Sequence, residues 1–325
     1  MSSDNIKIIQ ILYDISNYAA ILKQKYKARA YLRGAKEIEK LTINLTPDNV
    51  KNILVQQKVP YVGPGITSTV IEFLTTGKVK ELNSLRSNPK IIAHKELSQI
   101  IGVGPVTVEQ WWLDEIKSIK DLKQAIADGK ILLNNMQTLG LKYVDDLNQR
   151  IPRAVVSEIA ASIKSLIDIE DNAIQFEVAG SYRRGAETSG DIDILITGEI
   201  TLSDVITRLK IDPRFIEAVS SGKEKITFLY KDTDNIARQV DIIVMNKDKY
   251  AAALLYFTGN WEFNAKMRGC AKARGYRLNQ NGLFKIIPGG MLQLVKTMTE
   301  HDIFKELKLN YIQPSERNID SITCE

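Results

Sequence analysis

Hydrophobic residues in the first 88 positions recur every three or four residues, which is the spacing of an amphipathic helix. The segments 6–24 and 28–41 follow this pattern, and the Thr-Pro pair at 46–47 is a typical start of a further helix. The sequence therefore predicts that the N-terminal part is helical throughout.

Two segments, 59–77 and 97–116, resemble one another. Each has the pattern of a helix, a tight glycine-rich turn and a second helix. The turns carry the glycine pairs Gly63 with Gly65 and Gly102 with Gly104. Glycine permits close backbone approach, and the amides that open the second helix can face a phosphate. One such turn is equally well explained as a plain helix hairpin, but its repetition favours binding to a nucleic-acid backbone.

Beyond residue 173 the hydrophobic period changes to that of β-strands. One helical pattern, 202–211, lies among the strand-like runs, and another, 261–276, leads into short strands around an Asn-Gly turn. The four strand-like runs span 174–180, 191–197, 224–230 and 238–245. We therefore expect an α+β fold in which a mostly antiparallel or mixed sheet is flanked by helices.

Positive charge is concentrated in the helical N-terminal part. Residues 1–88 hold 13 Lys or Arg and 7 Asp or Glu, whereas the rest of the 44 basic and 39 acidic residues nearly balance. This asymmetry indicates a phosphate-rich partner for the N-terminal part, although a merely soluble basic region would have the same composition.

The composition is that of an intracellular protein. No apolar run approaches the roughly 20 residues that cross a bilayer, and the first residues lack the features of a signal peptide. Cys270 and Cys324 lie in no ligand-like cluster, and Cys324 lies so close to the C-terminus that we expect no structural disulfide. We therefore expect a reducing compartment, nucleus or cytoplasm, and no membrane partner.

Three aspartates lie in apolar, β-branched runs. Asp191 and Asp193 are two residues apart and project from the same face of a strand, and Asp241 lies in the run 238–245. A buried aspartate is costly unless it is paired or binds a metal. Three such acids on neighbouring strands would suit two Mg²⁺ ions, or Mn²⁺ in their place, in phosphoryl transfer.

The residues before these acids fit the same chemistry. Gly180 and Ser181 offer a turn with a hydroxyl and amide donors, and Arg183 and Arg184 can bind phosphate oxygens. The alternative is that the acids cap turns or form surface ion pairs. The motifs of other reaction classes are missing from the sequence. It has no P-loop, and with only two histidines, His94 and His301, a Ser-His-Asp triad or a Cys/His zinc cluster is disfavoured.

On these motifs the chain resembles the family X DNA polymerases, most of all their beta-type members. Segment 180–197 matches the nucleotidyltransferase signature, 253–276 the nucleotide-binding segment and 302–317 the C-terminal end. The two glycine turns correspond to the family's helix-hairpin-helix motifs. The resemblance implies four parts: a helical lyase-like domain that binds DNA ends (1–88), a fingers-like hairpin subdomain (89–152), a nucleotidyltransferase palm (153–260) and a nucleotide-binding C-terminal subdomain (261–325).

The resemblance also implies roles for particular residues. Asp191, Asp193 and Asp241 would be the catalytic metal ligands. The residues that would hold the nucleotide are Arg150, Ser181, Arg184, Gly190, Tyr256, Phe257, Thr258, Gly259, Trp261, Asn264 and Arg268. The residues that would contact DNA are Lys27, Tyr31, Gly63, Gly65, Gly102 and Gly104. Backbone carbonyls at each hairpin turn would hold a monovalent cation.

The sequence departs from the beta-type pattern at the lyase position. Where those enzymes carry the lysine that forms a Schiff base, this chain has Thr69, and a threonine cannot form an imine. We therefore expect a domain that still grips a 5′-phosphate through Lys27 and Tyr31 but has lost or relocated the lyase activity. The substitutes considered for the nucleophile are Lys58, Lys78 and Lys80.

Other departures concern the nucleotide site and the first hairpin. Trp261 replaces an acid at the incoming base, where its indole can stack. Gln239 and Ile243 flank Asp241 where arginines are expected, and Tyr61 replaces the first glycine of the first hairpin.

The resemblance implies a monomeric, template-directed DNA polymerase that takes dNTPs and gapped or nicked DNA and fills short gaps, consistent with base excision repair. Two alternatives stay open. The first is a nucleotidyltransferase that extends DNA ends with little template guidance. The second is a catalytically silent protein that binds DNA ends, which the three retained aspartates disfavour.

Overall fold

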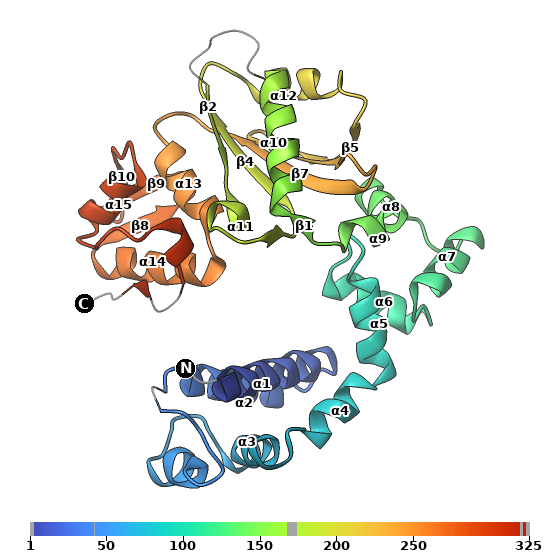
Figure 1. Cartoon of the computed structure of the whole chain (residues 1–325), viewed down its shortest axis with the longest axis vertical. Coiled ribbons are helices and arrows are strands. Elements are labelled where there is room, and N and C mark those ends of the chain that lie inside the picture. Colours follow the sequence, from blue (N-terminus) through green and yellow to red (C-terminus); the bar gives the residue numbers. More distant parts are fainter. Residues whose placement is uncertain (1–2, 42, 168–173, 319–320, 323–325) are drawn as a thin grey trace. The chain divides into compact units, whose positions relative to one another are not determined.

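Figure 1 shows the chain as a computed structural model, which describes residues 3–41, 43–167, 174–318 and 321–322. Its contacts divide the chain into two units, Met1–Gln137 and Thr138–Glu325. No helix among these described residues is long and apolar enough to cross a membrane.

The first unit is entirely helical in its described part, as the sequence predicted. Its elements are α1 (Ser3–Ile21), α2 (Lys25–Glu39), a π-helical turn (Asn52–Gln56), α3 (Pro64–Thr76), α4 (Lys80–Arg86), α5 (Pro89–Leu97), α6 (Pro105–Leu113) and α7 (Ile119–Ala127), while α8 (Asn135–Lys142) crosses the boundary between the units. The helix expected after the Thr-Pro pair is reduced to the π-helical turn.

An apolar cluster from α1 to α5 forms the core of this unit. Leu12 and Ile15 of α1 and Ile38 of α2 are fully buried in it, together with Ile66 and Val70 of α3. This packing fixes the first glycine turn against α2. Tyr61 in that turn has a φ of 59°, a left-handed conformation that favours glycine, so the tyrosine keeps the backbone expected of the glycine it replaces.

The second unit combines one large and one small sheet with helices. Its further elements are α9 (Val144–Leu147), β1 (Ile151–Pro152), α10 (Arg153–Ile167), β2 (Gln175–Val178), α11 (Gly180–Arg183), β3 (Thr188–Ser189), β4 (Ile192–Thr197), α12 (Leu202–Leu209), β5 (Phe215–Ser221), β6 (Lys225–Lys231), β7 (Ala237–Val244), α13 (Tyr250–Thr258), α14 (Trp261–Ala273), β8 (Tyr276–Asn279), β9 (Gly282–Ile286), β10 (Leu292–Val295), α15 (Glu300–Glu306) and a 3₁₀ turn (Pro314–Glu316).

The large sheet has the order β2-β4-β7-β6-β5. Strand β4 pairs with β7 in parallel, whereas the other neighbours pair antiparallel. The sheet is therefore mixed, and the four expected strands are confirmed as β2, β4, β6 and β7. Strand β5 was not predicted, because its run from Phe215 to Ser221 is only partly buried and carries register irregularities against β6.

The two faces of the large sheet are covered by different helices (Figure 1). Ile192, Ile194 and Ile196 of β4 pack with residues of α10 and α12 in one apolar cluster. Leu195 and Ile243 project to the opposite face and pack with Ala253 of α13. Because side chains alternate along a strand, Asp191 and Asp193 lie on this second face.

The C-terminal part has its own core of α14, β8, β9 and α15 around Phe263 and Phe304. Cys270 of α14 is fully buried in this core and is disulfide-bonded, so the expectation of no structural disulfide is wrong for Cys270. Cys324 lies outside the described residues. Ile322 is packed in the same core as Cys270. A disulfide-bonded Cys270 no longer supports a reducing compartment.

Candidate active site

Three carboxylates come together where β4 and β7 run side by side. In the parallel register Asp193 pairs directly with Asp241, and Asp191 immediately precedes β4. One carboxylate oxygen from each of Asp191, Asp193 and Asp241 lies within 4.8 Å of the others. The structure thus brings together the three acids that the sequence selected.

The environment of the three acids disfavours their negative charge. Burial and, after it, the charges of Asp191 and Asp241 together raise the pKa of Asp193 to about 7. Burial and the charge of Asp241 also raise the pKa of Asp191. The three acids therefore lack sufficient positive charge around them.

One lysine reaches the cluster, and the sequence did not point to it. Lys225 of β6 lies opposite Ile243 in the strand register, and its Nζ donates to Asp241 Oδ2 at 2.6 Å. The other oxygen of Asp241, Oδ1, is buried and has no hydrogen-bond partner among the described residues. A buried oxygen with an open lone pair, beside two further carboxylates, fits a cation ligand.

These residues fit divalent metal ions by their donor chemistry. Oxygen ligands from carboxylates are what hard divalent cations prefer, and Asp191, Asp193 and Asp241 present three such groups from two neighbouring strands. A bound cation would also relieve the repulsion that raises the pKa of Asp193.

The phosphate-binding candidates surround the carboxylates. Gly180 has a φ of 55°, and a Cβ there would collide with the Asp193 carboxylate, so the turn of α11 needs glycine. Ser181 Oγ donates to Ser189 Oγ at 2.8 Å. Arg150 Nε donates to Thr188 Oγ1 at 3.2 Å, and its Nη1 would lie 3.3 Å from a Cβ at Gly190.

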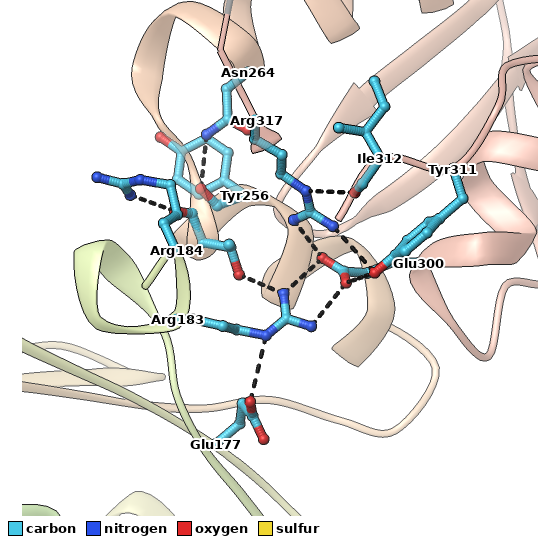
Figure 2. Close-up of polar contacts among 10 residues, drawn as sticks. Glu177, Arg183, Arg184, Tyr256, Asn264, Glu300, Tyr311, Ile312 and Arg317 are labelled. Carbon is cyan, nitrogen blue, oxygen red and sulfur yellow. Dashed lines mark hydrogen bonds and ion pairs between the residues drawn. The ribbon is translucent and has the colours of Figure 1, made fainter. Parts of the chain in front are cut away.

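Figure 2 shows that Arg183, the last residue of α11, and Arg184, which follows it, have different partners. Arg184 Nη1 donates to the Thr258 carbonyl at 2.6 Å, which ties the candidate phosphate-binding turn to the end of α13. Arg183 instead pairs with Glu300 through Nη1 at 3.1 Å and Nη2 at 2.9 Å. Arg183 is thus paired with a carboxylate of the protein, whereas Arg184 bonds only a backbone carbonyl among the described residues and lies beside Gly259.

Glu300 is held by two arginines (Figure 2). Its second partner is Arg317, whose Nη1 donates to Glu300 Oε1 at 2.8 Å and whose side chain is fully buried. Burial alone would raise the pKa of Glu300, but the hydrogen bonds and charges of Arg317 and Arg183 outweigh it and lower the pKa. The sequence did not point to Glu300 or Arg317, because they lie 117 and 134 positions from Arg183, although both fall in or next to the family-like C-terminal segment.

Three of the predicted nucleotide contacts line one pocket on α13 and α14. Tyr256, Asn264 and Arg268 contribute to it, and Asn264 Nδ2 donates to the Tyr256 carbonyl at 2.7 Å. Phe257 is half-buried and stacks edge-on against Tyr256. Figure 2 shows Asn264 and Tyr256 on the side of Arg184.

The residues at the junction of α13 and α14 have three different environments. Thr258 is fully buried and its hydroxyl accepts a hydrogen bond from Arg183, so it is a structural anchor. Gly259 has a φ of 66° and lies against Arg184. Trp261 at the start of α14 is 72% exposed, and an exposed indole of this kind is available for stacking.

In the helical unit, the predicted DNA-end residues line a pocket beside the first hairpin. Lys27 and Tyr31 of α2 line it together with Gly63 and Gly65 of the turn and the start of α3. Thr69 is buried, and its Oγ1 donates to the Gly65 carbonyl and lies 3.2 Å from the Tyr31 hydroxyl. Lys58, Lys78 and Lys80 are exposed.

The second hairpin follows the backbone of the first, with Gly102 at the position of Tyr61. Gly102 has a φ of 82°, and a Cβ there would lie 2.7 Å from Cγ of Met136, so this position needs glycine. Gly104 is the N-cap of α6, as Gly63 is of α3, and both precede a proline at the first helical position. The amides at the two helix starts are therefore similarly arranged.

Profiles of known protein families match most of the second half of the chain. Residues 150–251 match the profile described as DNA polymerase beta palm, and 253–318 match DNA polymerase beta thumb. Residues 95–148 match the fingers domain of DNA polymerase lambda. The three carboxylates fall within the palm match.

Curated relatives align with 97% of this chain. It is 27% identical to a DNA polymerase lambda of Arabidopsis thaliana and 28% identical to one of Rattus norvegicus, and it covers 62% and 56% of these proteins. It is 25% identical to a DNA nucleotidylexotransferase of Xenopus laevis and covers 69% of it. The chain thus spans about 60% of the length of the two polymerase lambda relatives.

Proposed function

Because the chain belongs to the family X DNA polymerases, we propose that it is a template-directed DNA polymerase that fills short gaps during DNA repair. Its substrates are gapped or nicked DNA and dNTPs, and base excision repair is the pathway that we propose for it. The primer 3′-oxygen forms a bond to the α-phosphorus of the nucleotide, and the bond to pyrophosphate breaks.

The observation that carries this proposal is the parallel register of β4 and β7. It places Asp193 beside Asp241 and leaves Asp241 Oδ1 buried without a partner among the described residues. A protein that kept this arrangement for stability alone would supply a cation for each acid, because unpaired buried carboxylates are destabilising. We take this as support for catalysis over the silent DNA-end-binding alternative.

Asp191, Asp193 and Asp241 would hold two Mg²⁺ ions, with Mn²⁺ as a substitute. When bound, such ions acidify an attacking hydroxyl and neutralise the leaving phosphates. Asp241, on β7, orients the primer end. Ser181, Arg184, Gly190 and Arg150 hold the triphosphate from the other side.

The new base pair packs against the surface formed by α13 and α14. There Asn264 and Arg268 face the minor-groove edge, where the acceptors are common to all base pairs, so their contacts test shape rather than sequence. Tyr256 and Phe257 crowd the sugar 2′-position and so favour deoxynucleotides. The exposed indole of Trp261 stacks on the nucleotide.

The hairpin turns of the helical unit contact the DNA backbone. We propose that Gly63, Gly65, Gly102 and Gly104 allow the helix starts to approach phosphates, with a monovalent cation bound by turn carbonyls. The excess of basic residues in positions 1–88 supports this placement of DNA. The active molecule is a monomer.

Asp241→Asn tests the proposal. We expect synthesis on a gapped substrate to fall by about three orders of magnitude or more, since a metal site supplies several kcal/mol of transition-state stabilisation. Affinity for the same DNA, measured by fluorescence anisotropy, should change little. The matched control is Asp248→Asn, because Asp248 is exposed.

Equal loss of synthesis in both variants, or full synthesis by Asp241→Asn, would overturn the proposal. The similarity to a DNA nucleotidylexotransferase supports one alternative, namely extension without a template. A single-stranded primer with one dNTP separates the two functions. Comparable extension with and without template would favour the alternative.

A further inference from the structure

The first glycine turn of the helical unit carries an exposed tyrosine in a backbone conformation that tyrosine disfavours. Tyr61 has a φ of 59°, in the left-handed region, and is 60% exposed. This conformation costs free energy for a residue with a Cβ, and an exposed side chain gains little packing in return. Strain that local packing does not explain is typical of residues kept for a function.

Helix α2 fixes the ring of Tyr61. The guanidinium carbon of Arg33 lies 5.1 Å from the ring centroid, in a cation–π contact. The adjacent Gly34 permits this close approach, because a Cβ there would lie 2.6 Å from Cδ1 of Ile66 and 3.4 Å from the Tyr61 carbonyl oxygen. The ring is therefore held in a defined position although most of it is open to solvent.

The same ring forms part of the wall of the pocket where the DNA end is expected. Tyr61 lines this pocket, of about 510 Å³, together with Lys27, Tyr31 and the start of α3, whereas Arg33 does not line it. Glu81 of α4 orients the two polar side chains, since it pairs with Lys27 Nζ and accepts a hydrogen bond from the Tyr31 hydroxyl at 2.9 Å. The pocket thus combines donors for a 5′-phosphate with an aromatic ring.

The pocket also lacks the amine that would react with a baseless sugar. Thr69 stands at the lyase position, and a threonine cannot form an imine. Its Oγ1 donates to the Gly65 carbonyl at 3.0 Å and lies 3.2 Å from the Tyr31 hydroxyl, so it belongs to the packing beside the pocket. Relative to the family pattern, the pocket has lost an amine and gained the ring of Tyr61. An aromatic face can stack on a base, and a baseless sugar phosphate offers none.

We propose that Tyr61 is a stacking platform for the base of the 5′-terminal nucleotide in a gap, while Lys27 and Tyr31 bind its 5′-phosphate. The pocket then selects a 5′ end that keeps its base over a baseless sugar phosphate. This deepens the proposed function and rests on it, since it assumes that the chain binds gapped DNA. In a repair sequence, a reaction that removes the baseless sugar phosphate precedes gap filling by this chain.

The test is equilibrium binding of the full chain to two gapped duplexes, measured by fluorescence anisotropy with no dNTP present. Both carry a 5′-phosphate in the gap. They differ only in whether the 5′-terminal residue has its base or is a tetrahydrofuran analogue of the baseless sugar. We expect the preference for the base-containing end to be about tenfold larger in the wild type than in Tyr61→Gly. Any effect of the missing base on the duplex itself cancels in this comparison.

Tyr61→Gly also separates stacking from stability. Glycine suits the left-handed φ, so this variant should unfold at an equal or higher urea concentration than the wild type although it loses the preference. Tyr61→Phe is the matched control, because it keeps the ring and should keep the wild-type preference. Tyr61→Asn is a second variant without the ring, since asparagine tolerates the same backbone conformation.

An equal preference in the wild type, Tyr61→Gly and Tyr61→Asn, with binding intact, would overturn the inference. So would loss of the preference in a folded Tyr61→Phe, because the ring would then not carry it. A Tyr61→Gly variant less stable than the wild type would also count against it, since the tyrosine would then serve packing. Failure of the wild type to bind either duplex at low salt would instead overturn the proposed function, so the two failures are distinguishable.

Discussion

Two clusters of buried carboxylates in the second unit are treated in opposite ways. Glu300 lies between Arg183 and Arg317, and its pKa is lowered. Asp193 lies beside two other acids, and burial with their charges raises its pKa to about 7. Both are inside the same unit, so the difference does not come from burial alone.

This contrast distinguishes Glu300, which stabilises the structure, from the three aspartates, whose negative charge is only partly compensated. Glu300 of α15 forms ion pairs with Arg183 of α11 and with Arg317, which follows the C-terminal 3₁₀ turn. The cluster therefore links these three elements. At the three aspartates the chain supplies Lys225 to Asp241 and leaves Asp241 Oδ1 open among the described residues. Incomplete neutralisation at this point is consistent with a site for metal ions.

The largest effect is expected from breaking the satisfied cluster. Glu300→Ala leaves the cations of Arg183 and Arg317 buried without a counter-charge, and we expect a loss of about 3–5 kcal/mol in the free energy of unfolding. Urea unfolding measures it. Glu316→Ala is the control, since Glu316 is exposed, and an equal loss in both variants would contradict a structural role for Glu300.

An intermediate effect of opposite sign is expected at the aspartates. In metal-free protein, Asp193→Asn removes repulsion, so at pH 8 it should raise the free energy of unfolding by about 2 kcal/mol. The gain should be confined to high pH. The Asp193 carboxyl of the folded protein holds its proton up to about pH 7, whereas an unfolded one loses it near pH 4.

Between these values the folded wild type binds more protons than the unfolded chain, so Asp193 lowers stability as pH rises from about 4 to 7. Urea unfolding of the wild type and Asp193→Asn at several pH values, in chelator, measures this difference. The two curves should converge at low pH. Parallel curves across the range would contradict the raised pKa of Asp193.

The smallest effect is expected from removing Lys225, the lysine that pairs with Asp241. Lys225→Met removes the ammonium from Asp241 and should tighten Mn²⁺ binding about fivefold, because a positive charge no longer opposes the ion. Electron paramagnetic resonance of free Mn²⁺, in the absence of DNA, measures the affinity. Lys231→Met on the same strand is the control, and weaker binding in Lys225→Met would mean that Lys225 helps to build the site.

Several features could be predicted from the sequence because they depend on local spacing. Asp191 and Asp193 share a strand face by their separation of two residues, and the change from helical to strand period marked the palm. The departures from the family pattern at Thr69 and Trp261 could also be read from the sequence alone. Thr69 stands where a lysine is expected, and the structure adds that Trp261 is exposed.

Other features depend on contacts between distant positions, which no local period encodes. The parallel pairing of β4 with β7 brings Asp241 to Asp193 across 48 positions, and Glu300 reaches Arg183 across 117. Glu81 meets Tyr31 across 50 positions. The sequence determined which groups were available for the site. Tertiary packing decided which acids received a cation and which were left to bind one, because charge compensation depends on spatial neighbours.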